Sequence, residues 1–176
     1  MFLFLVGCSS DHADNGQFAL DFRTTMLGSS GCSFSAKITA DYDDHVFVFS
    51  MDCRSKDGQM HLCVKEPEPI AGIAATVSDS GTELVFEDVE LDFGQLANGR
   101  VSPVTVPGLL EQCWRSAYIA WSGADGEAQR ITYLHGYNSE ELTVDTWFSD
   151  GVPFYAEVLC DNVKCISVEI LNFEIL

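Results

Sequence analysis

Apolar side chains recur at every second position along three runs between residues 33 and 64, and this period of two constrains the fold more than any other feature of the chain. The apolar faces carry Phe34, Ala36, Ile38 and Ala40 in the first run, Phe47, Phe49, Met51 and Cys53 in the second, and Met60, Leu62 and Val64 in the third. Alternation of this kind predicts β-strands with one buried face.

Short turn sequences between these runs predict how the strands pair. A two-residue turn at Asp57-Gly58 places Met51 opposite Val64 and Cys53 opposite Leu62, so the large apolar groups share one face. The same reasoning at Asp43-Asp44 places Ile38 opposite Phe49. At Ser80-Gly81 it sets Val77 against Leu84 and Ala75 against Phe86, with Ile73 beyond them. Five antiparallel strands with a common apolar surface follow.

Two helices are expected beside these strands. Phe18, Phe22 and Met26 recur at a spacing of four, which predicts a short amphipathic helix from Asp14 to Gly28. Ser102-Pro103 is typical of a helix start, and Pro107-Gly108 restarts or kinks that helix. Along it a wide aromatic stripe is predicted, made of Leu110, Trp114, Tyr118 and Trp121. Periodicity alone favours a core role for this stripe.

Four further strand-like runs complete the chain, at residues 130–137, 141–148, 153–160 and 165–173. The order of helix, five strands, helix and four strands predicts an α+β domain with a curved antiparallel sheet closed over a helix. With 27 acidic and 9 basic residues among 176, the formal charge is −18. Because nucleic-acid affinity depends mainly on Lys and Arg, nucleic acid is excluded as a partner, and so is electrostatic docking on an anionic bilayer.

The N-terminus carries a different signal. Residues 1–7 are apolar and end in Leu5-Val6-Gly7 directly before Cys8, and polar sequence extends from there to Gly16. This order resembles the lipobox of bacterial lipoproteins, in which the cysteine receives a diacylglyceryl group. We therefore expect residues 1–7 to be the remnant of a signal peptide, with its basic region upstream of Met1. Residues 8–16 form the lipidated cysteine and linker, and residues 17–176 the folded domain.

Three segments resemble the bacterial lipoprotein-carrier and lipoprotein-receptor superfamily of the Lol system, in particular its lipid-anchored relatives. They are residues 67–73 (PEPIAGI), residues 91–103 (LDFGQLANGRVSP) and residues 145–157 (DTWFSDGVPFYAE). The resemblance implies a half-open β-barrel with a helical lid, which encloses an apolar cavity suited to acyl chains. It also implies a location outside the cytoplasm, on the outer face of the bacterial plasma membrane.

The expected partners are thus the membrane, through the anchor, and a lipid or lipoprotein acyl chain. The residues expected to line the cavity are Phe47, Phe49, Met51, Leu62, Ile73, Phe86, Leu110, Trp114, Tyr118, Phe148 and Phe154. The alternative is a packed core, in which case the domain binds or regulates a cell-envelope enzyme through its acidic surface.

The remaining chemistry is sparse. The turn register separates Cys53 from Cys63, and a three-residue loop at 161–163, which aligns Phe154, Ala156 and Val158 with Ile170, Val168 and Ile166, disfavours a bridge between Cys160 and Cys165. Free thiols are therefore expected. His61 and Cys63 share a strand face but lack further ligands, so neither a metal nor a cofactor is expected. Because no nucleophile or phosphate-loop motif is present, we expect the domain to be non-catalytic.

Overall fold

The computed structural model describes residues 11–42, 45–78, 81–86, 89–93, 96–97, 100–136 and 142–176. Within these ranges it describes the side chains of all residues except 11–15 and 81–100. Its helical elements are α1 (Asp11–Gly28), η1 (Glu68–Ile70), η2 (Pro103–Thr105) and α2 (Val106–Arg115). The strands are β1 (Cys32–Asp41), β2 (Val46–Lys56), β3 (Gln59–Glu66), β4 (Ala74–Ser78), β5 (Gly81–Phe86), β6 (Val89–Phe93), β7 (Leu96–Ala97), β8 (Arg100–Val101), β9 (Ile119–Asp125), β10 (Ala128–His135), β11 (Leu142–Ser149), β12 (Val152–Cys160) and β13 (Val163–Ile175).

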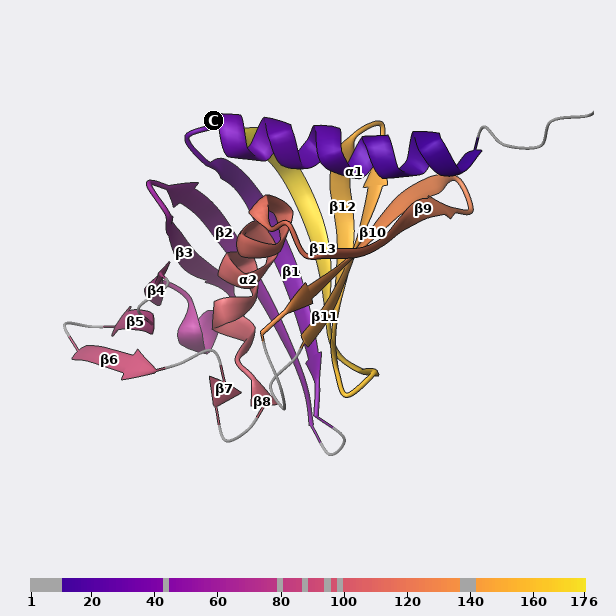
Figure 1. Ribbon diagram of the computed structural model, residues 1–176. Coiled ribbons are helices and arrows are strands. Elements are labelled where there is room, and N and C mark those ends of the chain that lie inside the picture. The colour runs from indigo at the N-terminus through magenta and orange to yellow at the C-terminus, as the bar shows by residue number, and fades with distance from the viewer. Residues whose placement is uncertain are drawn as a thin grey trace, which may run out of the picture.

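Eleven strands form one antiparallel sheet in the order β6-β5-β4-β3-β2-β1-β13-β12-β11-β10-β9, and β7 pairs with β8 separately. The sheet curves around α2, while α1 runs across the upper end of the strands in Figure 1. The chain therefore has the predicted α+β fold, a half-open barrel covered by a helical lid. Among the described strands, β1 and β13 are the one pair that joins segments far apart in sequence, and this pairing unites the two halves of the sheet.

Two of the three predicted registers in the first half of the sheet are confirmed. Met51 pairs with Val64 and Cys53 with Leu62, across a turn in which Asp57 and Gly58 both have positive φ. Positive φ at both central residues is what a type I′ hairpin turn requires, and Asp and Gly tolerate it. Ile38 pairs with Phe49 as predicted, although the turn residues 43–44 lie outside the described residues.

The register predicted for β4 and β5 is wrong by two residues. Ala75 pairs with Leu84 instead of Phe86, Val77 pairs with Thr82, and Gly81 is the first residue of β5. A shift of two residues keeps every side chain on the same face, so the apolar pattern does not distinguish the two registers. The sequence pattern also did not predict β6, which pairs with β5 and extends this side of the sheet.

The aromatic stripe predicted along the second helix is interrupted. α2 ends at Arg115, because Ser116 takes an extended conformation and its Oγ accepts a hydrogen bond from the Tyr118 N–H at 3.0 Å. A serine that satisfies nearby backbone groups competes with helix continuation. Tyr118 therefore follows the helix, and Trp121 lies on β9, a strand that the sequence pattern did not reveal.

The core lies between the concave face of the sheet and the two helices. Phe22 and Met26 of α1 and Leu110 and Trp114 of α2 are each no more than 6% exposed. The Trp114 ring is the centre of this packing. Its centroid lies 5.5 Å from that of Phe173 and 5.6 Å from that of Phe34, in edge-to-face arrangements. The middle of the half-barrel is thus filled by helix side chains.

Candidate ligand cavity at the seam of the half-barrel

A cavity of about 810 Å³ lies where the two sides of the curved sheet approach each other across the end of α2. We call it the seam cavity, and its walls come from four places in the fold. They are the α1–β1 loop (Ser29, Ser30), the β2–β3 turn (Asp57, Gly58), the end of α2 (Glu111, Gln112, Arg115, Ser116) and the neighbouring ends of β9 and β10 (Tyr118, Leu134, His135, Gly136). Its volume is within the range of small-molecule sites.

The lining of the seam cavity is amphipathic. Leu134 is 36% exposed and Tyr118 is 59% exposed, so both present apolar surface in a lining that also contains serines and charged groups. The two residues are also linked through the backbone, since the Leu134 N–H donates to the Tyr118 carbonyl at 3.0 Å. A molecule with one apolar and one polar part matches such a lining better than a purely apolar chain.

A chain of hydrogen bonds holds the end of α2 in place beside the cavity. Arg115 Nε donates to Glu111 Oε1 at 2.7 Å, and Arg115 Nη2 donates to Ser29 Oγ at 3.3 Å. The same Glu111 oxygen accepts from Ser55 Oγ at 2.9 Å, and Ser55 Oγ accepts from the Cys32 N–H at 3.0 Å. Glu111 is only 6% exposed, so these partners provide what water otherwise supplies to a carboxylate.

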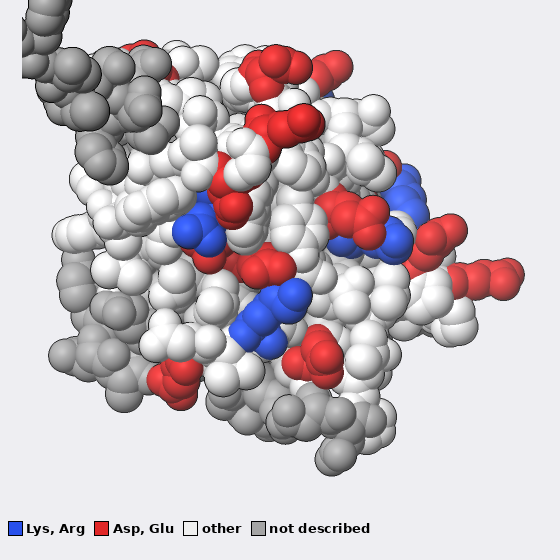
Figure 2. All heavy atoms as spheres, turned by 90° about the vertical axis from the view of Figure 1, so that its right-hand side faces the viewer, with Lys and Arg blue, Asp and Glu red and all other residues white. Residues whose placement is uncertain are grey.

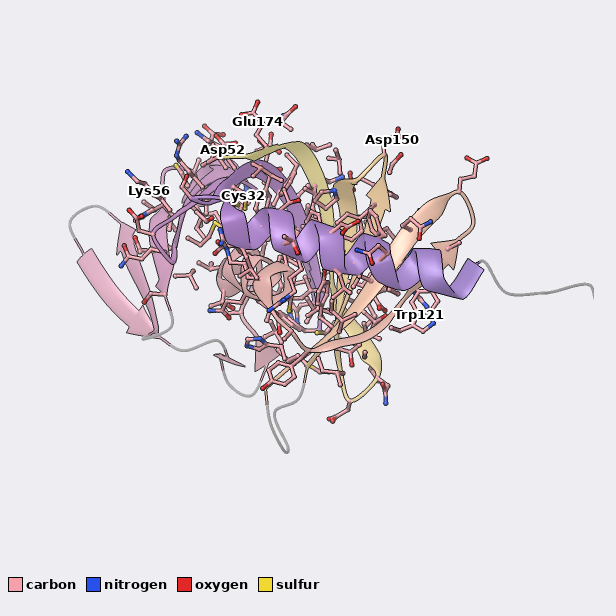
Figure 3. The ribbon with its side chains drawn as sticks, turned by 45° about the horizontal axis from the view of Figure 1, so that its top comes forward. Cys32, Asp52, Lys56, Trp121, Asp150 and Glu174 are labelled. Carbon is pink, nitrogen blue, oxygen red and sulfur yellow. The ribbon has the colours of Figure 1, made fainter. Side chains whose placement is uncertain are left out.

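Close backbone contact supports this arrangement at the α1–β1 loop. A Cβ atom on Gly31 would lie 2.0 Å from the Ser55 carbonyl oxygen, which is far inside van der Waals contact. Glycine is therefore required for the loop to approach β2 at this point. In Figure 3, the neighbouring Cys32 lies at the end of α1, whereas Asp52 and Glu174 lie on the outer side of the sheet.

One titratable group in the cavity wall has a shifted pKa. Burial lowers the pKa of His135, because desolvation disfavours the imidazolium form.

The pKa of Asp52, on the outer face, is lowered mainly by its hydrogen bond with Lys65, whose Nζ lies 3.1 Å from Asp52 Oδ2. The latter pair is exposed, so we assign it little stabilising effect.

The eleven residues predicted to line an apolar cavity occupy three kinds of position. Met51, Leu62, Leu110, Trp114 and Phe148 are buried in the core, and Phe49 and Ile73 pack half-buried against it. Phe47, Tyr118 and Phe154 are exposed, at 45%, 59% and 43%, and the Phe86 side chain lies outside the described residues. Of these residues, Tyr118 lines the seam cavity. Cys8, the predicted lipidation site, lies outside the described residues.

The residues that organise the seam cavity are not evident from the sequence pattern. Glu111 and Arg115 are spaced by four on α2, and this spacing is the one local signal that predicts a pair. Ser55 is separated from Glu111 by 56 positions, so only the tertiary fold reveals their contact. Leu134 and His135 end an ordinary strand run, and nothing in their pattern marks them as cavity residues.

The thiols are free in the described part of the chain, namely Cys32, Cys53, Cys63, Cys113, Cys160 and Cys165. Burial raises the pKa of Cys32 to about 11, and the pKa values of Cys53 and Cys113 are also raised by burial. Within the described residues, no group of three or more His, Cys, Asp or Glu side chains is arranged to hold a metal ion. Among these residues there is also no helix with the length and apolar character needed to cross a bilayer.

No protein-family model matches the chain, and no curated protein matches its sequence. Solved structures do resemble its fold. An uncharacterised conserved protein from Thermus thermophilus aligns with a TM-score of 0.50 and 8% identity, over 92% of this chain and 87% of that one. A LolA superfamily protein from Nitrosomonas europaea aligns with a TM-score of 0.48 and 10% identity, over 92% of this chain and 94% of that one. The lipoprotein LppX from Mycobacterium tuberculosis aligns with a TM-score of 0.48 and 13% identity, over 93% of this chain and 96% of that one.

At these identities the comparisons bear on the fold alone, and of these three structures the Thermus protein has the TM-score that carries that argument. The half-barrel with a helical lid, which the resemblance to the Lol superfamily implied, is confirmed by the observed sheet order and by the position of α2 in its concave face.

Proposed function

We propose that this chain is an extracytoplasmic lipoprotein that binds an amphiphilic ligand, such as a lipid with an acyl chain, without catalysis. The seam cavity is the observation that carries the proposal. Its 810 Å³ is ample for a drug-sized or single-chain amphiphile, and its lining joins an apolar side at Tyr118 and Leu134 to a polar side at Arg115 and Ser116. In this arrangement the apolar part of the ligand lies on Leu134 and its polar part near Arg115.

The packing of α2 supports entry at the seam rather than through the core. A bound chain in the centre of the half-barrel would have to replace Trp114, which is fully buried and donates a hydrogen bond from Nε1 to Thr146 Oγ1 at 3.2 Å. A Cβ on Gly108 would lie 2.7 Å from Val77 Cγ1, so α2 also lies tightly against β4. Displacing such a helix removes close-packed contacts on both sides.

The test is native mass spectrometry of residues 9–176 produced in bacteria, followed by mild extraction and lipid analysis. We expect a bound amphiphile that is lost in Leu134→Asp, because a carboxylate beside the apolar part of the ligand would be desolvated on binding. Leu171→Asp is the matched control, since Leu171 is 53% exposed on β13 and does not line the seam cavity. A ligand-free wild type, or equal occupancy in both variants, would contradict the proposal.

The anchor is a separate part of the proposal and has its own test. Cells that express the chain behind a complete signal peptide are labelled with an alkyne fatty acid. The label should be incorporated into the wild type and not into Cys8→Ser. Fractionation should then place the wild type with the plasma membrane and release Cys8→Ser from it. Labelling of Cys8→Ser at the wild-type level would refute lipidation at this position.

A second candidate function rests on the charge of −18. Under this reading the half-barrel is a protein-interaction module that binds or regulates a cell-envelope enzyme through acidic side chains. On the face shown in Figure 2, acidic side chains are interspersed with basic ones instead of forming one patch. Capture of one envelope protein that survives removal of lipid, and is lost when exposed acidic residues are reversed to lysine, would favour this function.

A further inference from the structure

Two cysteine thiols meet at the tip of the β12–β13 hairpin. Cys160 Sγ and Cys165 Sγ are 3.6 Å apart, and both side chains are half-buried. The sequence favoured a three-residue loop at 161–163 that would keep them apart, and the structure corrects this expectation. Cys160 pairs with Val163, so the turn contains only Asp161 and Asn162.

The local backbone explains the short turn and the contact. Asp161 and Asn162 both have positive φ, at 51° and 61°, as a type I′ turn requires, and both residue types tolerate this conformation. The register then shifts between Val158 and Leu159. Because of that shift, Ala156 and Val158 still face Val168 and Ile166 as predicted, while Cys165 comes diagonally beside Cys160.

This pair differs from the other thiols of the chain. Cys32, Cys53 and Cys113 are buried in the core, which makes them inaccessible to dissolved reagents. In the described part of the chain, no second pair of thiols lies within hydrogen-bonding distance. A zinc ion normally takes four protein ligands at a structural site, and no third ligand joins these two among the described residues. Covalent chemistry between the two sulfurs is therefore favoured over metal binding.

We propose that Cys160 and Cys165 are an oxidisable dithiol, which closes to an intramolecular disulfide by exchange with a small-molecule or protein disulfide. The two cysteines are diagonal neighbours across the hairpin, and their side chains lean toward each other closely enough for the sulfurs to meet. The sulfurs need only approach from 3.6 Å to bonding distance, which side-chain rotation provides. This site does not depend on the proposed ligand or on the anchor.

The reaction balances without a further reagent. The Cys160 thiolate attacks one sulfur of the oxidant disulfide, which forms a mixed disulfide and releases one thiolate. The Cys165 thiolate then attacks the Cys160 sulfur of that mixed disulfide and releases the second thiolate. The two protons lost by the cysteines are taken up by the two thiolates that leave. Two protein thiols are oxidised, and one disulfide is reduced to two thiols.

The surroundings of Cys165 set the order of these steps. Burial, together with the proximity of Cys160, raises the pKa of Cys165 to about 12, so this thiol is protonated at neutral pH. Cys165 also donates to the Val158 carbonyl at 3.3 Å. Because this hydrogen bond holds the Cys165 proton in place, we assign the first attack to Cys160. In the mixed disulfide, burial still raises the pKa of Cys165, but the charge and the hydrogen bond of Cys160 no longer add to it, and Cys165 attacks in the second step.

The chain offers a sharp test, because Lys164 lies between the two cysteines. The folded protein is incubated with excess oxidised glutathione, free thiols are alkylated under denaturing conditions, and the protein is digested with trypsin. Cleavage after Lys164 separates residues 131–164 from residues 165–176, each of which contains one cysteine. We expect these two peptides to remain joined until a reductant is added.

Variants and a denatured control complete the experiment. Cys63→Ser should give the same cross-linked peptides as the wild type, since Cys63 is a half-buried thiol outside the pair. Cys160→Ser and Cys165→Ser should lose the cross-link, and the Cys165→Ser protein should instead hold one glutathionyl group at Cys160. The proposal is overturned if the native protein forms no cross-link, or if the cross-link forms only when the protein is first unfolded in urea.

Discussion

The substitution Trp114→Phe tests the claim that α2 is a fixed part of the core. Trp114 is fully buried, and its Nε1–H is donated to the fully buried Thr146 hydroxyl. Replacing the indole by a phenyl ring removes apolar volume equivalent to roughly two methylenes, about 1.6 kcal/mol at 0.8 kcal/mol each. The Thr146 hydroxyl also loses its donor, which costs about 1–3 kcal/mol for a buried polar group. We expect a total loss of about 3–5 kcal/mol in the free energy of unfolding.

The assay is urea unfolding at pH 7, followed by far-ultraviolet circular dichroism, for four proteins: the wild type, Trp114→Phe, Thr146→Val and the double variant. In the double variant no hydroxyl is left without its donor, so it should recover about 1 kcal/mol relative to the sum of the single variants. A loss below about 1 kcal/mol for Trp114→Phe would refute the reasoning, because it would mean that the helix side chain is loosely held. An additive double variant would refute the role of the hydrogen bond.

Three further substitutions test the packing of α2 and the surroundings of the seam cavity. Gly108→Ala places a Cβ 2.7 Å from Val77 Cγ1 and should lower the free energy of unfolding by about 1–3 kcal/mol, with partial recovery in Gly108→Ala/Val77→Ala. Arg115→Met leaves the buried Glu111 carboxylate bonded to Ser55 alone among the described side chains. Because Arg115 is itself partly exposed, the loss in the free energy of unfolding should be about 1–3 kcal/mol. The double variant Glu111→Gln/Arg115→Met should recover much of this loss, since no buried charge is then left without its partner. Burial lowers the pKa of His135 in the folded state, so the unfolded chain binds this proton more readily and stability falls as the pH drops below about 6.5. His135→Gln should flatten that part of the stability profile, and an unchanged slope in urea titrations between pH 7.5 and 5.5 would show that His135 does not contribute to it.

Local sequence rules predicted the strands well wherever a turn fixed the register. Asp57-Gly58 is the clearest case, because a two-residue turn that tolerates positive φ determines the pairs from Lys56–Gln59 to Met51–Val64, up to the register shift at Ser50. The same rules failed at β4 and β5, where a shift of two residues keeps the apolar face intact. They also failed at 160–165, where Asp and Asn made the tighter turn and a register shift restored the inward pattern.

The candidate site was harder to predict than the fold, for two physical reasons. The end of α2 depends on one local hydrogen bond at Ser116. The helical spacing of aromatic residues in the sequence therefore continues to Tyr118 and Trp121, although the helix ends at Arg115. The seam cavity is formed by side chains from both sides of the sheet, such as Asp57 and Leu134, whose proximity follows from the curvature of the sheet and from the β1–β13 pairing. No periodic pattern encodes this proximity. The resemblance suggested an apolar cavity, and the structure indicates a mixed one.

The most direct test of the proposed binding site is a titration of residues 9–176 with a fluorescent fatty acid, with unlabelled fatty acid as competitor. We expect saturable binding of one molecule per chain, and at least about tenfold weaker binding by Leu134→Asp, which corresponds to about 1.4 kcal/mol. Leu171→Asp should bind as the wild type does. Binding that does not saturate, or that is equally strong in Leu134→Asp, would contradict the assignment of the seam cavity as the ligand site.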